Sequence, residues 1–295
     1  MTGLELSRRL PRARGGLFQG PFWRRFLRHQ AAAAVGLILY ALALAAMLAP
    51  VLAPADPFEA ALDRALLGPS ATYPLGTDQL GRDILSRIIY GARLSLLIGL
   101  VSVGLSLAIG MPLGAVAGLR QGWVDQVVVG LADVLLSFPP LLLAIAVVAV
   151  LGPGLVNAMI AVGIAQAPIY IRLVRAEVLR VQAEPFVEAA RAVGCPESRV
   201  LLTHIVPNTL GPTIVQSTLN LATAILSAAS LGFLGLGAQP PLPEWGAMLS
   251  DGRRYLQVVP HVSIFPGLAI MVTVLAFNLF GDGLRDALDP RMTIR

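Results

Sequence analysis

Six long apolar runs, separated by shorter polar segments, dominate the 295-residue chain. A helix rises about 1.5 Å per residue, so about 20 apolar residues suffice to cross a hydrocarbon core of about 30 Å. The pattern therefore predicts an all-α, polytopic membrane protein with six transmembrane helices. These are expected near residues 31–53, 92–118, 125–151, 155–175, 208–235 and 262–282.

The first apolar run has two interpretations. Ala41-Leu42-Ala43 has the form of a signal-peptide cleavage site. The run is, however, longer than the roughly 7–15 apolar residues of a signal peptide. We therefore expect residues 31–53 to be retained as a first transmembrane helix.

Composition and charge agree with lipid as the main solvent. The chain is 56% hydrophobic and 13% charged, whereas soluble domains carry about 25% charged residues. All 22 basic residues are Arg, and sixteen of them lie in alternate polar segments that begin with residues 1–30. Cytoplasmic loops are enriched in basic residues, which predicts that both termini are cytoplasmic.

This orientation divides the chain into five parts. The outer connection is rich in Pro, Asp and Gly, and we expect a short amphipathic helix around residues 83–90. The parts are a basic cytoplasmic tail (1–30), a first transmembrane helix (31–53), a periplasmic connection (54–91), a five-helix core (92–283) and a cytoplasmic tail (284–295). The basic tail is expected to contact anionic lipid headgroups, not nucleic acid.

The inner connection between the fourth and fifth runs predicts a short helix within residues 184–194. Pro185 suits a first helical position and Gly194 suits a helix end. Phe186, Ala190 and Val193 recur at i, i+4 and i+7 and are expected on one face. Such an apolar face fits either a groove on a partner or the bilayer surface, and composition does not separate the two. A second helical stretch is expected between residues 196 and 207.

The same connection resembles the EAA signature of ABC-importer permeases. Glu188-Ala189-Ala190 is followed by Gly194 and then by His204-Ile205-Val206-Pro207. The general pattern ends Ile-x-Leu-Pro, so His204 and Val206 depart from it in the manner of peptide permeases. In that family the segment is the coupling helix that sits in a cleft of the ATPase subunit. The resemblance thus implies ATPase-coupling roles for Phe186, Glu188, Ala189, Ala190 and Gly194.

Three further blocks resemble the C-type subunit of the dipeptide, oligopeptide and nickel permeases. They are residues 76–83, 233–246 and 281–290. Residues 142–154 are similar to glutathione permeases as well as dipeptide permeases. The resemblance implies the type I ABC-importer permease fold in a bacterial inner membrane.

It also implies partners: a second homologous permease subunit, two ATPase subunits that use ATP and Mg, and an external substrate-binding protein. No cofactor is expected on this chain. Dipeptides or oligopeptides are the leading cargo, and glutathione and nickel remain open, because the external binding protein does most of the selecting.

A stripe of small residues runs along the second span. Ser102 and Ser106 are followed by Gly110, Gly114 and Gly118, at four-residue intervals. Small residues at this spacing let helix backbones approach closely in lipid. Helix packing is therefore expected, and a direct role in transport is the alternative.

A polar stripe runs along the fifth span, through Thr209, Thr213, Gln216, Asn220, Thr223, Ser227 and Ser230. Polar groups in hydrocarbon are costly unless they are paired or wet. The alternatives are interhelical hydrogen bonds, bonds back to the preceding turn, or a translocation path. The candidate path residues are Thr213, Gln216, Asn220, Thr223 and Ser227.

Other chemistry is poorly represented. Without Lys the chain cannot form a Walker A phosphate loop, and it has no nucleophile–base pattern, so no catalytic residues are assigned. Three distant His residues and one Cys, Cys195, argue against a metal site. Asp133 is expected to pair with Arg172 or Arg175. An ion-coupled carrier or an intramembrane enzyme would need ionisable groups inside the spans, which makes both the weaker alternatives.

Overall fold

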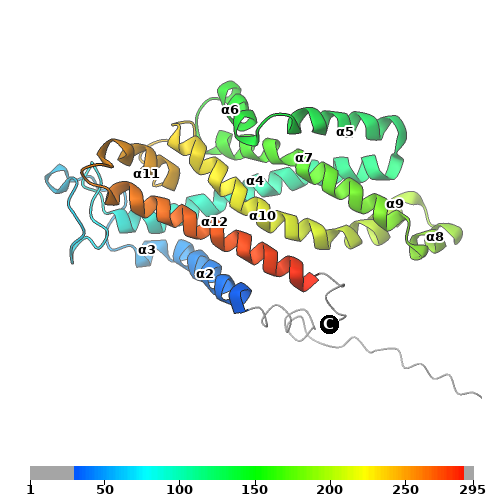
Figure 1. Cartoon of the computed structure of the whole chain (residues 1–295), viewed down its shortest axis with the longest axis horizontal. Coiled ribbons are helices and arrows are strands. Elements are labelled where there is room, and N and C mark those ends of the chain that lie inside the picture. Colours follow the sequence, from blue (N-terminus) through cyan, green and yellow to red (C-terminus); the bar gives the residue numbers. More distant parts are fainter. Residues whose placement is uncertain (1–29, 289–295) are drawn as a thin grey trace, which may run out of the picture.

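The computed structural model describes residues 30–288, with side chains from residue 34 onward. Over this part the chain is helical apart from turns and an isolated bridge between Thr77 and Asp83. The predicted basic tail therefore lies almost wholly outside the described residues. The α-helices are α2 Gln30–Met47, α3 Ala49–Leu52, α4 Ile84–Arg120, α5 Gly122–Leu136, α6 Pro140–Leu151, α7 Leu155–Gln182, α8 Pro185–Ala192, α9 Glu197–Arg199, α10 Val206–Phe233, α11 Trp245–Gly252 and α12 His261–Leu288 (Figure 1).

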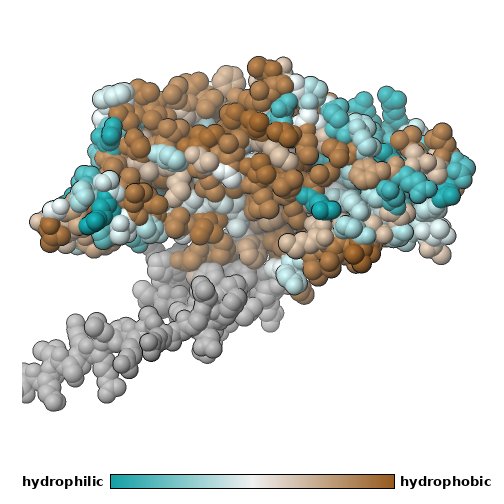
Figure 2. Space-filling view, turned by 180° about the vertical axis from the view of Figure 1, so that it is seen from behind, coloured by the Kyte–Doolittle hydropathy of each residue, from teal (hydrophilic) through white to brown (hydrophobic). Residues whose placement is uncertain are grey.

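Four helical stretches in the described part are long and apolar enough to cross a membrane: α4, α7, the continuous stretch Glu197–Phe233, and α12. Helices α5 and α6 are long and apolar enough only when they are taken together. If they form one bent span, the described residues contain five spans. The first predicted span falls on α2 and α3, and the described apolar helix there, Ala34–Met47, is shorter than a full span. The described residues thus contain four or five spans, compared with the six expected. Figure 2 shows an apolar belt over the middle of the molecule and polar surface toward its ends.

The predicted third span, residues 125–151, is wrong as a single helix. It consists of α5 and α6, which meet at a bend of 95°. Pro139 and Pro140 lie at the junction. Proline lacks the N–H that a continuing helix needs and pushes the preceding residue out of the helical region. Pro140 instead starts α6, where a missing N–H costs little.

The amphipathic helix predicted at residues 83–90 is not a separate element. It forms the first two turns of α4, which runs for 37 residues. The Asp83 carboxylate caps it by accepting hydrogen bonds from the Ser86 N–H, at 2.8 Å, and the Ser86 hydroxyl, at 2.6 Å. Arg93 and Arg120 then bracket an uncharged stretch of this helix, which is about 40 Å long at 1.5 Å per residue. That length matches a bilayer core with its interfaces.

The small-residue stripe of α4 packs against α7 within this chain. A Cβ added at Gly110 would lie 2.4 Å from the Cβ of Tyr170, and one added at Gly114 would lie 2.6 Å from the Ile171 carbonyl oxygen. The Ser106 hydroxyl donates to the Gly163 carbonyl at 2.8 Å. Packing inside the subunit is therefore the interpretation that the geometry favours.

The loops and helix α11 close one end of the bundle, and α8 and α9 lie at the opposite end (Figure 1). Helix α11 packs against α10, α12 and α4. The Trp245 indole donates to the Ile88 carbonyl at 3.1 Å, and Gly91 leaves room for its ring. Gly246 lies so close to the Ala229 backbone that an added Cβ would be 2.1 Å from the carbonyl oxygen. Close glycine contacts thus hold α11 on the spans.

Candidate functional site

Helix α8 lies inside the segment predicted for coupling, residues 184–194. Pro185 occupies its first turn. After its last residue, Gly194 adopts φ +83°, and its N–H donates to Arg191 at 2.9 Å. The Cys195 N–H donates to the Ala190 carbonyl at 3.1 Å. This pair of bonds is a Schellman motif, which needs a residue that tolerates the left-handed region.

The two faces of α8 differ from the prediction in one residue. Phe186 and Val193 are exposed, at 45% and 80%, and Glu188 and Ala189 are exposed with them. Ala190 is buried instead and packs with Val187 in the chain's own core. The predicted common face of Phe186, Ala190 and Val193 is therefore wrong for Ala190. Ala190 lies opposite the exposed face because α8 packs on α7 and on residues 200–205. The spacing of apolar residues within α8 does not reveal these neighbours.

The buried face of α8 joins the short helix to two long ones. Val187 and Ala190 belong to a cluster with Val174 and Val178 of α7 and with Ile205, next to α10. Arg191 also forms a two-pronged ion pair with Glu197, at 2.8 and 3.2 Å. The buried face of α8 therefore contacts both α7 and the segment that leads into α10.

The second helical stretch after Pro196 contains a π-helical segment, Val200–Ile205, which pattern reasoning missed. The Val206 N–H reaches back to the Leu201 carbonyl. Pro207 follows and has no N–H to offer Thr203, so the regular ladder is interrupted here. Pi-helical turns are uncommon and often lie at functional sites. Apolar spacing carries no signal for one such turn.

The polar stripe of α10 divides into two sets. Thr209, Thr213 and Asn220 are buried. The Thr213 hydroxyl donates to the Thr209 carbonyl at 2.7 Å, which is the bonding to the preceding turn given above as an alternative. Gln216 and Ser227 are half-buried and Thr223 is exposed. The five candidate path residues therefore do not share one open surface.

Helix α7 provides the interhelical partners. The Gln166 amide donates to the Thr223 hydroxyl, and the Tyr170 hydroxyl donates to the Ser217 hydroxyl, each at 3.2 Å. The Gln216 amide donates to the Asn220 side-chain oxygen at 2.9 Å. Gln216 also lines a cavity of about 450 Å³ with residues of α7, α10 and α12. Of the predicted path residues, Gln216 and Thr223 thus have open surroundings.

Two ion pairs connect α5 to α7. The predicted pairing of Asp133 with Arg172 is present, with Nε and Oδ1 3.3 Å apart. Arg175 pairs with Asp125 instead. The Asp125 pair was not predicted, although Asp125 lies in the first turn of α5, beside the C-terminal half of α7.

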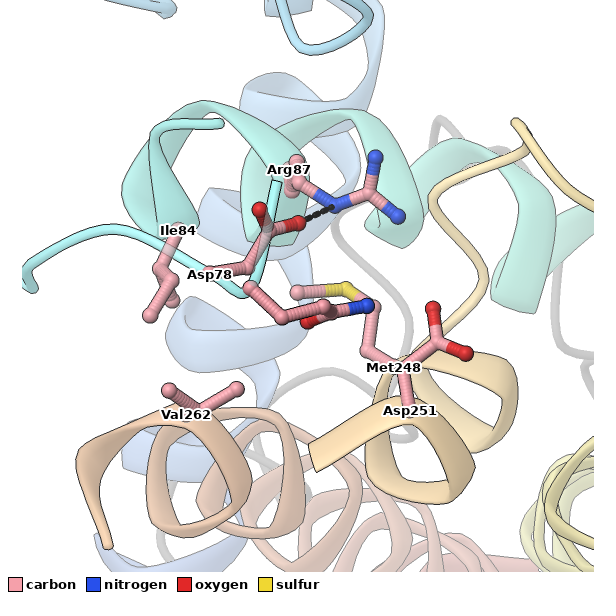
Figure 3. A pocket seen from close by; sticks show the side chains of 7 residues that line it. Asp78, Ile84, Arg87, Met248, Asp251 and Val262 are labelled. Carbon is pink, nitrogen blue, oxygen red and sulfur yellow. Dashed lines mark ion pairs between the residues drawn. The ribbon is translucent and has the colours of Figure 1, made fainter. Parts of the chain in front are cut away.

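Residues of the block at 76–83 lie beside α11, which begins within the block at 233–246, at the end of the molecule opposite α8. Asp78 accepts from the Arg82 Nε at 2.7 Å and lies 3.5 Å from the Arg87 Nε. Arg87 also donates to the Pro57 carbonyl at 3.0 Å. Figure 3 shows Asp78 and Arg87 pointing toward one another, beside Met248 and Asp251 of α11. This end is held by buried charges.

Glu244 caps α11 at the same end. Its two carboxylate oxygens accept from the Gly246 and Ala247 N–H groups, each at 2.8 Å. Burial raises the pKa of Glu244, and the two backbone hydrogen bonds oppose that rise. With Gly232 of α10 against one oxygen, the carboxylate contributes to the contact between α11 and α10.

Two families match the chain. Residues 110–294 match the family described as binding-protein-dependent transport system inner membrane component. Residues 20–69 match the N-terminal transmembrane domain of oligopeptide transport permease C. The two matches together cover most of the chain.

Curated relatives cover nearly the same length. The dipeptide transport system permease protein DppC of Alkalihalophilus pseudofirmus is 50% identical over 92% of this chain and 90% of its own. The glutathione transport system permease protein GsiD of Pectobacterium atrosepticum is 48% identical over the same shares. The di/tripeptide transport system permease protein DppC of Pseudomonas aeruginosa is 48% identical over 92% and 91%.

A solved structure shares the fold. A chain of the methionine ABC transporter MetNI aligns with a TM-score of 0.58 at 19% identity, over 70% of this chain and 98% of that chain. The fold agrees with a type I ABC-importer permease. From the family match over more than half of the chain, and from relatives near 50% identity, the protein belongs to the binding-protein-dependent inner-membrane components, the multi-pass permease subunits of bacterial ABC importers.

Proposed function

We propose that this chain is the C-type permease subunit of an importer that moves di- or oligopeptides into the cell. The observation that carries the proposal is α8, a short helix with an exposed apolar and acidic face on a buried base. Relatives named for dipeptide and di/tripeptide transport, at 50% and 48% identity, support the cargo.

In this proposal α8 docks into an ATPase subunit through Phe186, Glu188 and Ala189. The Schellman motif at Gly194 sets the end of the helix, and Ala190 fits the helix to α7. Closure of the ATPases displaces α8, and the shared apolar cluster passes the displacement to α7 and α10. Access to the path then alternates between the two sides of the membrane.

The working complex contains this permease, a second homologous permease subunit, two ATPase subunits that use ATP and Mg, and a substrate-binding protein outside. This permease binds no cofactor of its own. Both termini and α8 face the cytoplasm, and α11 faces the binding protein. Gln216 and Thr223 line the translocation path, together with Ser227, whereas Thr213 and Asn220 act mainly through packing and hydrogen bonds.

Glutathione is the second candidate cargo, because a relative named for glutathione transport is 48% identical over the same share of the chain. Glutathione is itself a small peptide with charged termini. Nickel, expected from the resemblance, has no observation that favours it. An ion-coupled carrier has no support from the family.

The test is ATPase activity of the complete complex, reconstituted in lipid with its ATPase and binding-protein partners. A dipeptide, glutathione and nickel are added in turn, with Glu188→Lys as the coupling variant. Asp286→Lys, an exposed acidic position on α12, is the matched control for the change in charge. We expect one peptide cargo to stimulate hydrolysis in the wild type and the control but not in Glu188→Lys.

Stimulation by nickel alone would overturn the peptide assignment. Stimulation that persists in Glu188→Lys would overturn the coupling role of α8. Assembly of each variant with its ATPase is checked by size-exclusion chromatography, so that a folding defect is not read as uncoupling.

A further inference from the structure

The ion pair between Asp133 of α5 and Arg172 of α7 is exposed at the level of the membrane spans. The two side chains are 48% and 58% exposed. Charged groups facing hydrocarbon are costly and are found where they meet protein or water. The face that carries this pair is therefore not expected to face lipid.

Two hydrogen bonds show which side of the molecule this is. Gln166 and Tyr170 of α7 bond to Thr223 and Ser217 of α10, so α10 flanks α7 on one side. Asp133 places α5 on the other side. Between the two flanks, Arg172 and Ala176 are exposed, and Leu173 lines the 450 Å³ cavity together with Gln216. Arg172 and Gln216 therefore open onto the same face.

The same bonds set the depth. They pair residue 166 with 223 and residue 170 with 217, so Arg172 lies at about the level of Gln216. Arg172 is ten residues from the end of α7 at Gln182, which corresponds to about 15 Å along the helix, and Arg175, Glu177 and Arg180 lie between them. The charged pair thus lies near the inner end of the apolar part of the span.

Helix α6 covers the outer half of α7 on the α5 side. Ala144 and Val148 are buried there against Ala158 and Val162. The 95° bend between α5 and α6 lets α6 pack in this way. Only the inner half of the face, with its charged pair, stays open.

Another ion pair also joins α5 to α7. Asp125 and Arg175 already tie α5 to α7, and their side chains are less exposed, at 15% and 32%. A second, exposed pair deeper in the span is therefore free to exchange partners.

From this geometry we propose that Asp133 and Arg172 form a charged subsite for cargo on the transport surface. Arg172 binds the carboxylate of a zwitterionic peptide, for which its planar fork is suited, and Asp133 binds the ammonium group. Inserting a zwitterion replaces one ion pair by two and leaves no charge unpaired. The inference rests on the proposed function, because it takes the cargo to be a peptide with free termini.

The test measures access to this face with a cysteine. In a Cys195→Ser chain, Ala176→Cys lies one turn inward of Arg172. Val116→Cys, at an exposed position of α4, is the matched control. The complete complex in lipid nanodiscs is treated with a water-soluble maleimide, with increasing dipeptide, glutathione or an N-acetylated dipeptide amide. Uptake of the same dipeptide by the parent complex is measured separately in proteoliposomes.

We expect Ala176→Cys to react and Val116→Cys not to react. A peptide with free termini should slow labelling of Ala176→Cys, and the uncharged amide should not. Adding Arg172→Gln or Asp133→Asn should raise, by about tenfold, the dipeptide concentration at which the labelling rate is halved. That change is equivalent to ~1.4 kcal/mol.

Three results would overturn the subsite: no labelling of Ala176→Cys, no protection by zwitterionic peptides, or equal protection in the Arg172→Gln and Asp133→Asn variants. Failure of peptide uptake in the parent complex counts against the proposed function. If protection persists despite that failure, the subsite stands, and only the assignment of its ligand as cargo is lost.

Discussion

Glycines, whose side chain is a single hydrogen, set the distance between α4 and α7. The three glycines of the α4 stripe face backbone or Cβ atoms of α7 at distances that no side chain could occupy. Gly104, one and a half turns before Gly110, has no such neighbour. Substituting a packed glycine and an unpacked glycine in the same helix therefore separates the effect of lost packing space from the effect of the substitution on the helix backbone.

We predict that Gly114→Ala destabilises the subunit. The new Cβ would meet the Ile171 carbonyl oxygen at 2.6 Å, which is backbone and cannot rotate away. Overpacking of this kind costs about 1–3 kcal/mol. The check is thermal unfolding of the purified complex, in which Gly114→Ala should lower the midpoint and Gly104→Ala should not. An equal effect of the two changes would contradict the packing role.

At the scale of elements, breaks in the helices determine the architecture as much as the helices do. Two prolines divide α5 from α6, and the π-helical turn before Pro207 separates the α8 segment from α10. Both breaks lie where α7 meets its neighbours. The helical segments that pack beside α7 are therefore discontinuous.

The left-handed turn at the end of α8 can be tested by substituting Gly194. A Cβ added at Gly194 would have no atom within 4 Å, so Gly194→Ala causes no clash, but Gly194 has φ +83°. The left-handed region costs a residue with a Cβ roughly 1–2 kcal/mol. We expect Gly194→Ala to lower peptide uptake per ATP hydrolysed, and Gly194→Asn to lower it less, because Asn tolerates this region.

Gly104→Ala is the control, because its Cβ would also meet nothing within 4 Å and its φ is not in the left-handed region. The measurement compares uptake and ATP hydrolysis in the same proteoliposomes. If Gly194→Ala and Gly104→Ala gave the same ratio as the wild type, the shape of this turn would not matter for coupling.

At the scale of the whole molecule, buried charges hold the connection at residues 54–83 on the spans. Asp78 accepts from Arg82 and faces Arg87, and all three side chains are at most 6% exposed. Arg87 donates to the Pro57 carbonyl near the start of this connection and lies 3.5 Å from the Pro241 carbonyl. Segments more than 150 residues apart thus meet around the Arg87 guanidinium.

We predict that Asp78→Asn loosens this end of the molecule. Removing one partner of a buried ion pair costs about 3–5 kcal/mol, because the other charges stay buried and unpaired. The expected result is faster cleavage of residues 54–83 by an added protease. Asp63→Asn removes an exposed ion pair with Arg64, which is worth about 0–1 kcal/mol. The protease should cleave this variant at the wild-type rate.

Periodicity and helix-breaking residues were sufficient to predict the helical fold, the place of most spans, the helix start at Pro185 and the stop at Gly194. They also narrowed the partner of Asp133 to Arg172 or Arg175, because opposite charges at similar depth in neighbouring helices attract, and the structure chose Arg172. These features depend on each residue and its near neighbours in the chain, so the sequence by itself determined them.

Tertiary structure decided which side of each helix is open. Spacing places Thr213 and Gln216 on one polar stripe, yet one is buried and the other lines a cavity, because α7 covers only part of α10. Ala190 turns inward for the same reason, since α7 and the π-helical segment lie beneath α8. The 95° angle between α5 and α6 follows from packing on α7, which proline permits but does not set. A helix's own sequence defines its faces, and the neighbours that cover them come from contacts between distant parts of the chain.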